Sequence, residues 1–123
     1  MLQAQTKVRI ADNTGAKEGQ VFKVLGGSKR RYARIGDRVV FSVKTAEPRK
    51  QVKKKDVLHG VVVRQSKPYR RKDGSYISFD DNAVVVVEKG GNQPKGGRIF
   101  GPIPRELAEK GYQKIVSTAQ EVV

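Results

Sequence analysis

The side chains that could do chemistry in this sequence are mainly cationic, and they are clustered. Sixteen of its 26 Lys and Arg residues fall in three short stretches, 29–38, 44–55 and 64–72, where only Asp37 and Glu47 oppose them. Clustered ammonium and guanidinium groups attract a dense polyanion and bind its phosphates. The pattern therefore indicates phosphate recognition, with nucleic acid as the first candidate partner. A merely soluble basic protein is the alternative.

Catalytic chemistry has little support in the sequence. His59 is the single histidine, and Asp56 lies near it, but a general base also needs an oriented substrate and a partner group. The adjacent carboxylates of Asp80 and Asp81 would point to opposite faces of a strand. There is no Cys, so thiolate metal sites and disulfides are excluded. We expect no catalytic residue, no metal site and no cofactor.

Two weaker signals concern phosphate and base contacts. The run 26–29 (Gly-Gly-Ser-Lys) lacks the second Gly-Lys-Ser/Thr of a phosphate-binding loop. Phe22 and Phe41 fall within apolar runs and are expected in the core, whereas Tyr32 and Tyr69 lie beside arginines and are the plausible exposed rings. Few exposed rings favour phosphate and shape contacts over base stacking.

The elements that would position these cations are mostly strands. At 123 residues and a formal charge of +14, the chain is expected to form one domain. Alternating or continuous apolar runs predict strands, and the last two runs are too apolar for an open sheet with one solvated face. They fit a small closed barrel. The five predicted strands cover residues 6–10, 21–25, 38–44, 57–64 and 82–88.

The remaining segments predict a hairpin and a helical C-terminal part. Asp73-Gly74 favours a two-residue type I′ turn, which would lift the arginines of 64–72 clear of the barrel, unless the hairpin is only a solvated tip. Residues 90–97 are a glycine-rich loop, and a helix is expected over 105–110. Residues 112–117 could form a second short helix or a sixth strand. The predicted fold is mainly β: a five-stranded closed barrel with a projecting hairpin and a short helical C-terminal segment.

No targeting or membrane segment is expected. Residues 1–6 contain no apolar stretch of signal-peptide length. The valine runs are far shorter than the ~20 residues that cross a bilayer. The protein is therefore predicted to lie in the cytosol, or in an organelle if a transit peptide has been removed.

Residues 60–86 resemble the signature of a known family. They contain Gly60-Val61-Val62-Val63, then Asp73-Gly74, Phe79, Asn82 and Val85-Val86, at the spacing typical of the universal large-subunit ribosomal protein fourteen family. The resemblance extends in order over essentially the whole chain and is closest to the bacterial or plastid form. The other matching segments are 11–17, 23–28, 36–37 with 43–44, 53–57, 98–102 with 105–107, and 114–117 with 121–122.

This resemblance implies a single domain over 1–123, with the barrel in about 1–90 and the loop and helical part in about 91–123. It implies a structural role in the large ribosomal subunit, binding large-subunit rRNA and bridging to small-subunit rRNA. The implied bridging residues are Lys44, Arg49 and Arg98. The implied large-subunit rRNA contacts are Arg30, Arg31, Lys53, Lys54, Lys55, Arg64, Arg70 and Arg71.

The resemblance also implies protein partners. Gly97, Arg98, Lys114 and Ser117 would meet the neighbouring ribosomal proteins three and nineteen, or a ribosomal silencing factor. The family often has Thr at the position of Gly97, so this chain lacks a hydroxyl and a Cβ there. The location implied is the ribosome of a bacterial cytosol, or of a plastid. A free-standing RNA- or DNA-binding regulator and an RNA-modifying enzyme are the remaining alternatives.

Overall fold

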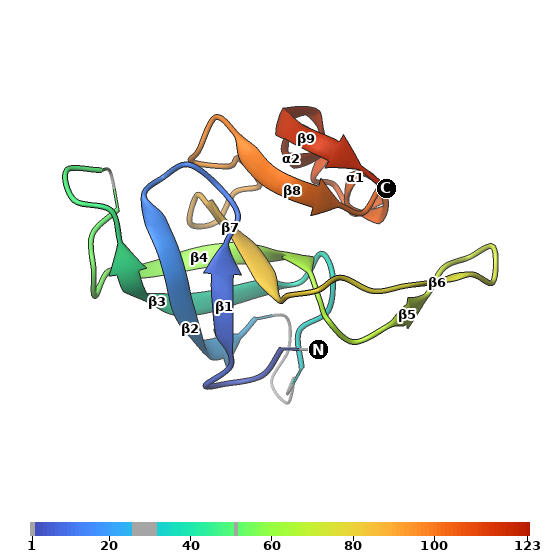
Figure 1. Ribbon diagram of the computed structural model, residues 1–123, viewed down its shortest axis with the longest axis horizontal. Helices are drawn as coiled ribbons and strands as arrows, with labels where there is room; N and C mark the ends of the chain where they lie inside the picture. Colours follow the sequence, from blue (N-terminus) through green and yellow to red (C-terminus); the bar gives the residue numbers. More distant parts are fainter. Residues whose placement is uncertain (1, 26–31, 51) are drawn as a thin grey trace.

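The main body of the molecule is a closed five-stranded barrel. The computed structural model describes residues 2–25, 32–50 and 52–123. The barrel order is β1-β2-β3-β4-β7, in which β1 and β7 are parallel and the other neighbours antiparallel (Figure 1). The predicted barrel is confirmed. Its strands are β1 (Lys7–Ile10), β2 (Ala16–Val24), β3 (Arg38–Ala46), β4 (Val57–Arg64) and β7 (Ala83–Val87).

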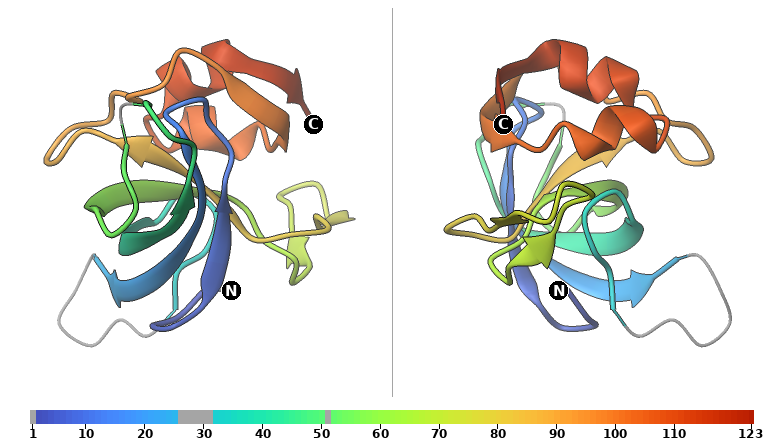
Figure 2. Two further views of the ribbon diagram at one scale, coloured as in Figure 1. Left: turned by 60° about the vertical axis from the view of Figure 1, so that its left-hand side comes forward. Right: turned by 90° about the vertical axis from the view of Figure 1, so that its right-hand side faces the viewer.

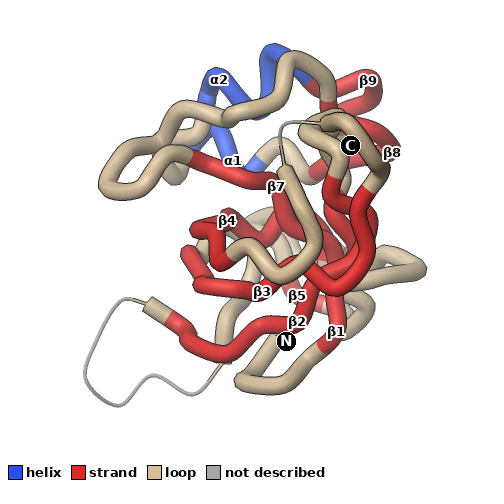
Figure 3. Tube along the Cα trace, turned by 90° about the vertical axis from the view of Figure 1, so that its left-hand side faces the viewer, coloured by secondary structure: helices blue, strands red, loops and turns tan. Residues whose placement is uncertain are grey.

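Two smaller units lie outside the barrel. The hairpin of β5 (Tyr69–Arg70) and β6 (Tyr76–Ile77) projects from one side, as predicted (Figure 1). The C-terminal part covers another side of the barrel (Figure 2), and it holds the helices of the described residues (Figure 3). It comprises β8 (Ile99–Ile103), α1 (Glu106–Glu109), α2 (Gln113–Thr118) and β9 (Ala119–Val122). Residues 112–117 are thus mainly helical, and the parallel β8–β9 pair was not expected.

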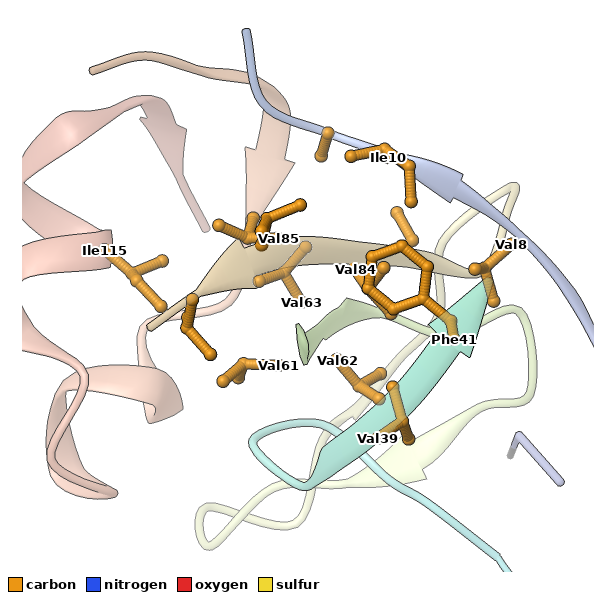
Figure 4. Close-up of a cluster of buried hydrophobic side chains, with 14 of the residues drawn as sticks. Val8, Ile10, Val39, Phe41, Val61, Val62, Val63, Val84, Val85 and Ile115 are labelled. Atoms are coloured by element: carbon orange, nitrogen blue, oxygen red, sulfur yellow. The ribbon is translucent and has the colours of Figure 1, made fainter. Parts of the chain in front are cut away.

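The valine runs are continuous because both faces of β4 and β7 are buried. Neighbouring strand residues point to opposite faces. Val62 and Val84 lie toward Phe41, whereas Val61 and Val85 lie toward Ile115 of α2 (Figure 4). One face of these two strands therefore fills the barrel, and the other packs under the C-terminal part.

Phe41 is the largest fully buried side chain, and two glycines make room for it. A Cβ placed on Gly19 of β2 would lie 2.7 Å from the Phe41 ring, and one on Gly60 of β4 would lie 2.8 Å from it. The ring is therefore enclosed between the strands on either side of its own, and larger residues at these positions would collide with it.

Phe22 was predicted in the core, but it is exposed. Its side chain is 49% accessible, while the neighbouring Val21 is fully buried opposite Phe41. Val21 faces the interior, and the register of β2 with β3 shifts between Val21 and Lys23, so that Phe22 is left outside the pairing and points to solvent. The apolar run alone could not show which of the two would face the interior.

The hairpin turn also differs from the prediction. A type I′ turn needs a positive φ at both Asp73 and Gly74, but only Gly74 has one, at 90°. The Gly74 amide donates to the Arg71 carbonyl at 3.0 Å, and the Arg71 amide to the Ser75 carbonyl at 2.8 Å. The Asp73 carboxylate accepts hydrogen bonds from the amide and hydroxyl of Ser75. The loop is thus a tight turn followed by a left-handed glycine bulge.

The turn at Asp12 and Asn13 helps to join the C-terminal part to the barrel. The buried Asp12 carboxylate accepts hydrogen bonds from the Val86 amide at 2.8 Å and from the Thr14 hydroxyl at 2.7 Å, which extends the contact between the end of β1 and β7. Burial raises the pKa of Asp12. The next side chain, Asn13, accepts from the amides of Gly97 and Arg98. This turn therefore fixes the start of β8.

Candidate nucleic-acid interface

The loop between β3 and β4 is held in place by main-chain contacts and one buried side chain. The Glu47 amide donates to the Gly15 carbonyl at 2.7 Å, and the Val52 amide to the Thr14 carbonyl at 3.2 Å. Val52 itself is only 2% exposed. Near β4, the Asp56 carboxylate accepts from the Lys53 amide at 3.0 Å. The loop is therefore anchored to the 12–16 turn, and its cations are presented from a fixed base.

The cations of this loop face solvent. Among the described residues, none of them forms an ion pair, so their charges remain available to a partner. Two of them, Arg49 at φ 63° and Lys55 at φ 75°, have left-handed backbones, which cost free energy for residues with a Cβ. Six exposed cations thus lie in this part of the chain: the five predicted contact residues Lys44, Arg49, Lys53, Lys54 and Lys55, and their neighbour Lys50.

The hairpin arginines differ in their surroundings. Arg70 is exposed. Arg71 is turned toward the C-terminal part: its Nε lies 2.6 Å from the Glu106 carboxylate, and its Nη2 donates to the main-chain oxygen of Val123 at 2.7 Å. Tyr69, expected as an exposed ring, is half-buried, and burial followed by the charge of Glu106 raises its pKa. Tyr32 is 47% exposed, as expected.

Arg64 lies at the junction of β4, the hairpin and β8. Its side chain is 10% exposed, with Nε 3.1 Å from the Asp81 carboxylate. Its Nη1 donates to the Phe100 carbonyl at 2.9 Å. Gly101 has a φ of 79°, and a Cβ there would collide with this guanidinium. The Nε and Nη1 atoms of Arg64 are therefore engaged in contacts inside the protein.

The predicted protein-partner residues lie in the segments that precede the two strands of the C-terminal sheet. Gly97 and Arg98 are exposed directly before β8, while Lys114 and Ser117 are exposed on α2, which leads into β9. The first residues of the two strands are paired in parallel, Ile99 opposite Ala119, so the segments before them lie side by side. A Cβ at Gly97 would have no neighbour within 4 Å. This end of the sheet is an accessible surface.

Arg30 and Arg31, together with the 26–29 run, lie outside the described residues. Their predicted contacts with rRNA therefore stay predictions from the sequence.

The candidate acid–base and metal-binding side chains are not brought together in the part of the chain that the structure describes. His59 is not joined to Asp56, whose carboxylate instead accepts from Lys53. Burial lowers the pKa of His59, and the charges of Arg38 and Lys89 lower it further. Within the same residues there is no group of three His, Asp or Glu side chains that could hold a metal ion. No helix in the part of the chain that the structure describes is long and apolar enough to cross a membrane.

Sequence reasoning missed the cleft beside β8. Arg9, on the outer face of β1, and Phe100, 45% exposed on β8, both line it. Arg9 alternates with the buried Val8 and Ile10, so its outward direction could have been read from the strand pattern. The position of Phe100 could not, because it depends on the long-range contact of β8 with the 11–13 turn.

The comparison with protein families gives one whole-chain match. The family model described as ribosomal protein L14p/L23e matches residues 1–123.

Proposed function

Because the chain belongs to the ribosomal protein L14p/L23e family, we propose that it binds large-subunit rRNA through its exposed cationic loops and helps to form bridges to small-subunit rRNA. As a member of this family it is a structural protein of the large ribosomal subunit. The observation that carries the proposal is the anchored 44–55 loop, whose described Lys and Arg side chains all face solvent without an internal ion pair.

The proposed contacts fall into a large-subunit group and a bridging group. Lys53, Lys54, Lys55 and Arg70 are exposed and are proposed to bind large-subunit phosphates directly, where each contact would release condensed counterions. Lys44, Arg49 and Arg98 are proposed to face the small subunit. Arg30 and Arg31 complete the large-subunit set as sequence predictions.

Arg64 and Arg71 are proposed to act on rRNA mainly through the segments that they hold. The internal ion pairs with Asp81 and Glu106 leave only part of each guanidinium for a phosphate. Removing either side chain would weaken the contacts of β8 or of the hairpin, and would shift the exposed cations nearby, such as Arg98 before β8 and Arg70 in β5.

The partner surface is proposed to be Gly97, Arg98, Lys114 and Ser117, which would meet ribosomal proteins three and nineteen or a silencing factor. Its support is the parallel start of β8 and β9, which brings Gly97 and Arg98 beside the end of α2, together with the exposure of Lys114 and Ser117 on that helix. The ribosome would be that of a bacterial cytosol or a plastid.

Sedimentation through sucrose at low magnesium, where the subunits separate, tests this function. Stoichiometric recovery of the chain in the large-subunit peak after a moderate salt wash is expected. A variant with Lys53→Ala, Lys54→Ala and Lys55→Ala should be recovered less. The control, Lys7→Ala with Lys23→Ala and Lys89→Ala, removes the same charge from other exposed positions and should behave like the unchanged chain. Recovery near the top of the gradient would instead indicate a free-standing RNA-binding protein.

A further inference from the structure

The cleft between the outer face of β1 and strand β8 combines an exposed ring with unpaired cations. It has a volume of about 420 Å³, which lies within the range of small-molecule sites. A second cleft of about 450 Å³ adjoins it and shares Arg9, Arg64 and Phe100 with it. Phe100 therefore lies at the border of both clefts, with 45% of its surface accessible.

Hydrogen bonds fix both the amide and the carbonyl of Phe100. Its amide donates to the Ala11 carbonyl at 2.6 Å, and its carbonyl accepts from Arg64 at 2.9 Å. Arg64 is itself fixed by Asp81, at 3.1 Å. An apolar ring that stays exposed to water contributes little to the free energy of folding. It does, however, offer a preorganised surface on which a flat ligand can stack.

Three cations that form no ion pair in the described part of the chain share the first cleft with this ring. Arg9, Lys17 and Lys50 line the first cleft, and all three are exposed. Glu18 lies opposite Arg9 in the β1–β2 register, yet in the described part of the chain no ion pair joins them. The acidic groups in the first cleft are Glu47 and Asp12, and the Asp12 carboxylate is already hydrogen-bonded to Thr14 and Val86. The first cleft therefore favours an anion.

A fixed exposed ring beside free cations matches the chemistry of a nucleotide, which has a flat base and a charged phosphate. We propose that this cleft binds one unpaired nucleotide of large-subunit rRNA, with its base stacked on Phe100 and its phosphate held by Arg9, Lys17 and Lys50. The inference rests on the proposed rRNA binding and adds a base-contacting site to the phosphate-contacting loops.

Variants at Phe100 test the base contact. Phe100→Leu should weaken binding to protein-free large-subunit rRNA by roughly 5- to 150-fold, the range for stacking of one base on an aromatic ring, whereas Phe100→Tyr should retain binding. Phe22 is the matched control: it is a 49% exposed ring on β2, outside both clefts, and Phe22→Leu should bind like the unchanged chain. Thermal melting of each variant checks that the fold is intact.

Tryptophan fluorescence distinguishes a base contact from a purely structural role of residue 100, because only a bound base would quench the emission. The chain has no Trp, so Phe100→Trp and Phe22→Trp each carry a single reporter. Quenching of the reporter at 100, but not of that at 22, upon addition of protein-free rRNA is expected.

The possible failures are distinguishable. If Phe100→Leu binds rRNA as tightly as the unchanged chain, or if Phe22→Leu loses as much, the nucleotide site is refuted while rRNA binding through the loops stands. If the reporter at 100 responds only to an added ribosomal protein and not to rRNA, the cleft is a protein-docking site and the proposal is overturned. If the unchanged chain itself fails to bind rRNA, the proposed function fails.

Discussion

At the scale of single residues, glycine occupies the two positions where the Phe41 ring leaves no space for a side chain. Gly60 and Gly19 enclose the Phe41 ring, and a Cβ on Gly60 would also lie 3.2 Å from the Val85 carbonyl. Neither glycine has a positive φ, so the reason for glycine is space and not backbone conformation.

Gly60→Ala is expected to destabilise the protein by about 1–3 kcal/mol, because the added methyl group overpacks a filled barrel. The measurement is the free energy of unfolding in denaturant. Gly97→Ala is the control, since a Cβ there meets no neighbour within 4 Å. The loss for the double variant Gly60→Ala with Phe41→Leu should be smaller than the sum of the two single losses, because the residues are in contact. Equal stabilities for the Gly60 variant and the unchanged chain would refute this packing account.

Lys55 is a cation at a strained backbone position, and its variants separate its contribution to rRNA binding from its cost in stability. Its φ of 75° favours glycine. Lys55→Gly and Lys55→Ala should weaken rRNA binding alike, since both remove one charge. Their stabilities should differ by about 1 kcal/mol in favour of Gly, because only Gly relieves the strain. Denaturant unfolding and rRNA titration of both variants provide the check, and a Gly variant less stable than the Ala variant would contradict it.

His59 predicts a pH dependence of stability. Its pKa in the folded state is lowered by burial, then by Arg38 and Lys89, whereas in the unfolded chain it is near 6.5. The unfolded state therefore binds more protons in the window just below pH 6.5. The contribution of His59 to stability is present above that window and is lost as pH falls through the folded pKa.

The difference in melting temperature between the unchanged chain and His59→Gln isolates this effect. Asp12, whose pKa is raised, acts with the opposite sign, since its contribution to stability falls as pH rises above about 3.8. Both proteins carry Asp12, so its effect cancels in the comparison. The unchanged chain should lose more stability than the variant between pH 7.5 and 5. A parallel loss would exclude His59 as the source.

At the scale of elements, the sequence was sufficient where apolar patterning is local. The five barrel strands follow from alternating or doubly buried runs, and helix α1 follows the proline-rich 102–104 segment. Strands β8 and β9 were missed because Gly101 and Pro102 interrupt the pattern and because their parallel pairing joins residues far apart in the chain. The roles of Arg64 and Arg71 were hidden for a similar reason, since Asp81 and Glu106 come near them only in the fold.

Arg71 should couple the hairpin to the C-terminal part. Arg71→Ala is expected to cost roughly 1–3 kcal/mol of stability, because it leaves the half-buried Glu106 carboxylate and the Val123 oxygen without their donor. Arg71→Lys should retain only part of this stability, since an ammonium cannot form the paired hydrogen bonds of a guanidinium. The neighbouring Arg70→Ala, at an exposed position, is the control and should leave the melting temperature unchanged. Identical melting temperatures for the two Ala variants would refute the proposed role of Arg71 in coupling the hairpin to the C-terminal part.

At the scale of the whole molecule, a charge of +14 on 123 residues opposes compaction, and a polyanionic partner would relieve that repulsion. The barrel sets the directions in which the cationic loops are presented, and the C-terminal part, which carries the proposed partner surface, covers one side of the barrel (Figure 2). That the whole chain folds as one domain stays a prediction.

The salt dependence of rRNA binding tests the central claim most directly. The logarithm of the binding constant for large-subunit rRNA, plotted against the logarithm of salt concentration, has a slope set by the number of phosphates neutralised. For the variant with Lys53→Ala, Lys54→Ala and Lys55→Ala, the slope should become shallower by about 2–3, because each phosphate contact contributes ~0.7–0.9. The variant with Lys7→Ala, Lys23→Ala and Lys89→Ala should keep the original slope. Equal slopes for all three proteins would contradict direct phosphate binding by this loop.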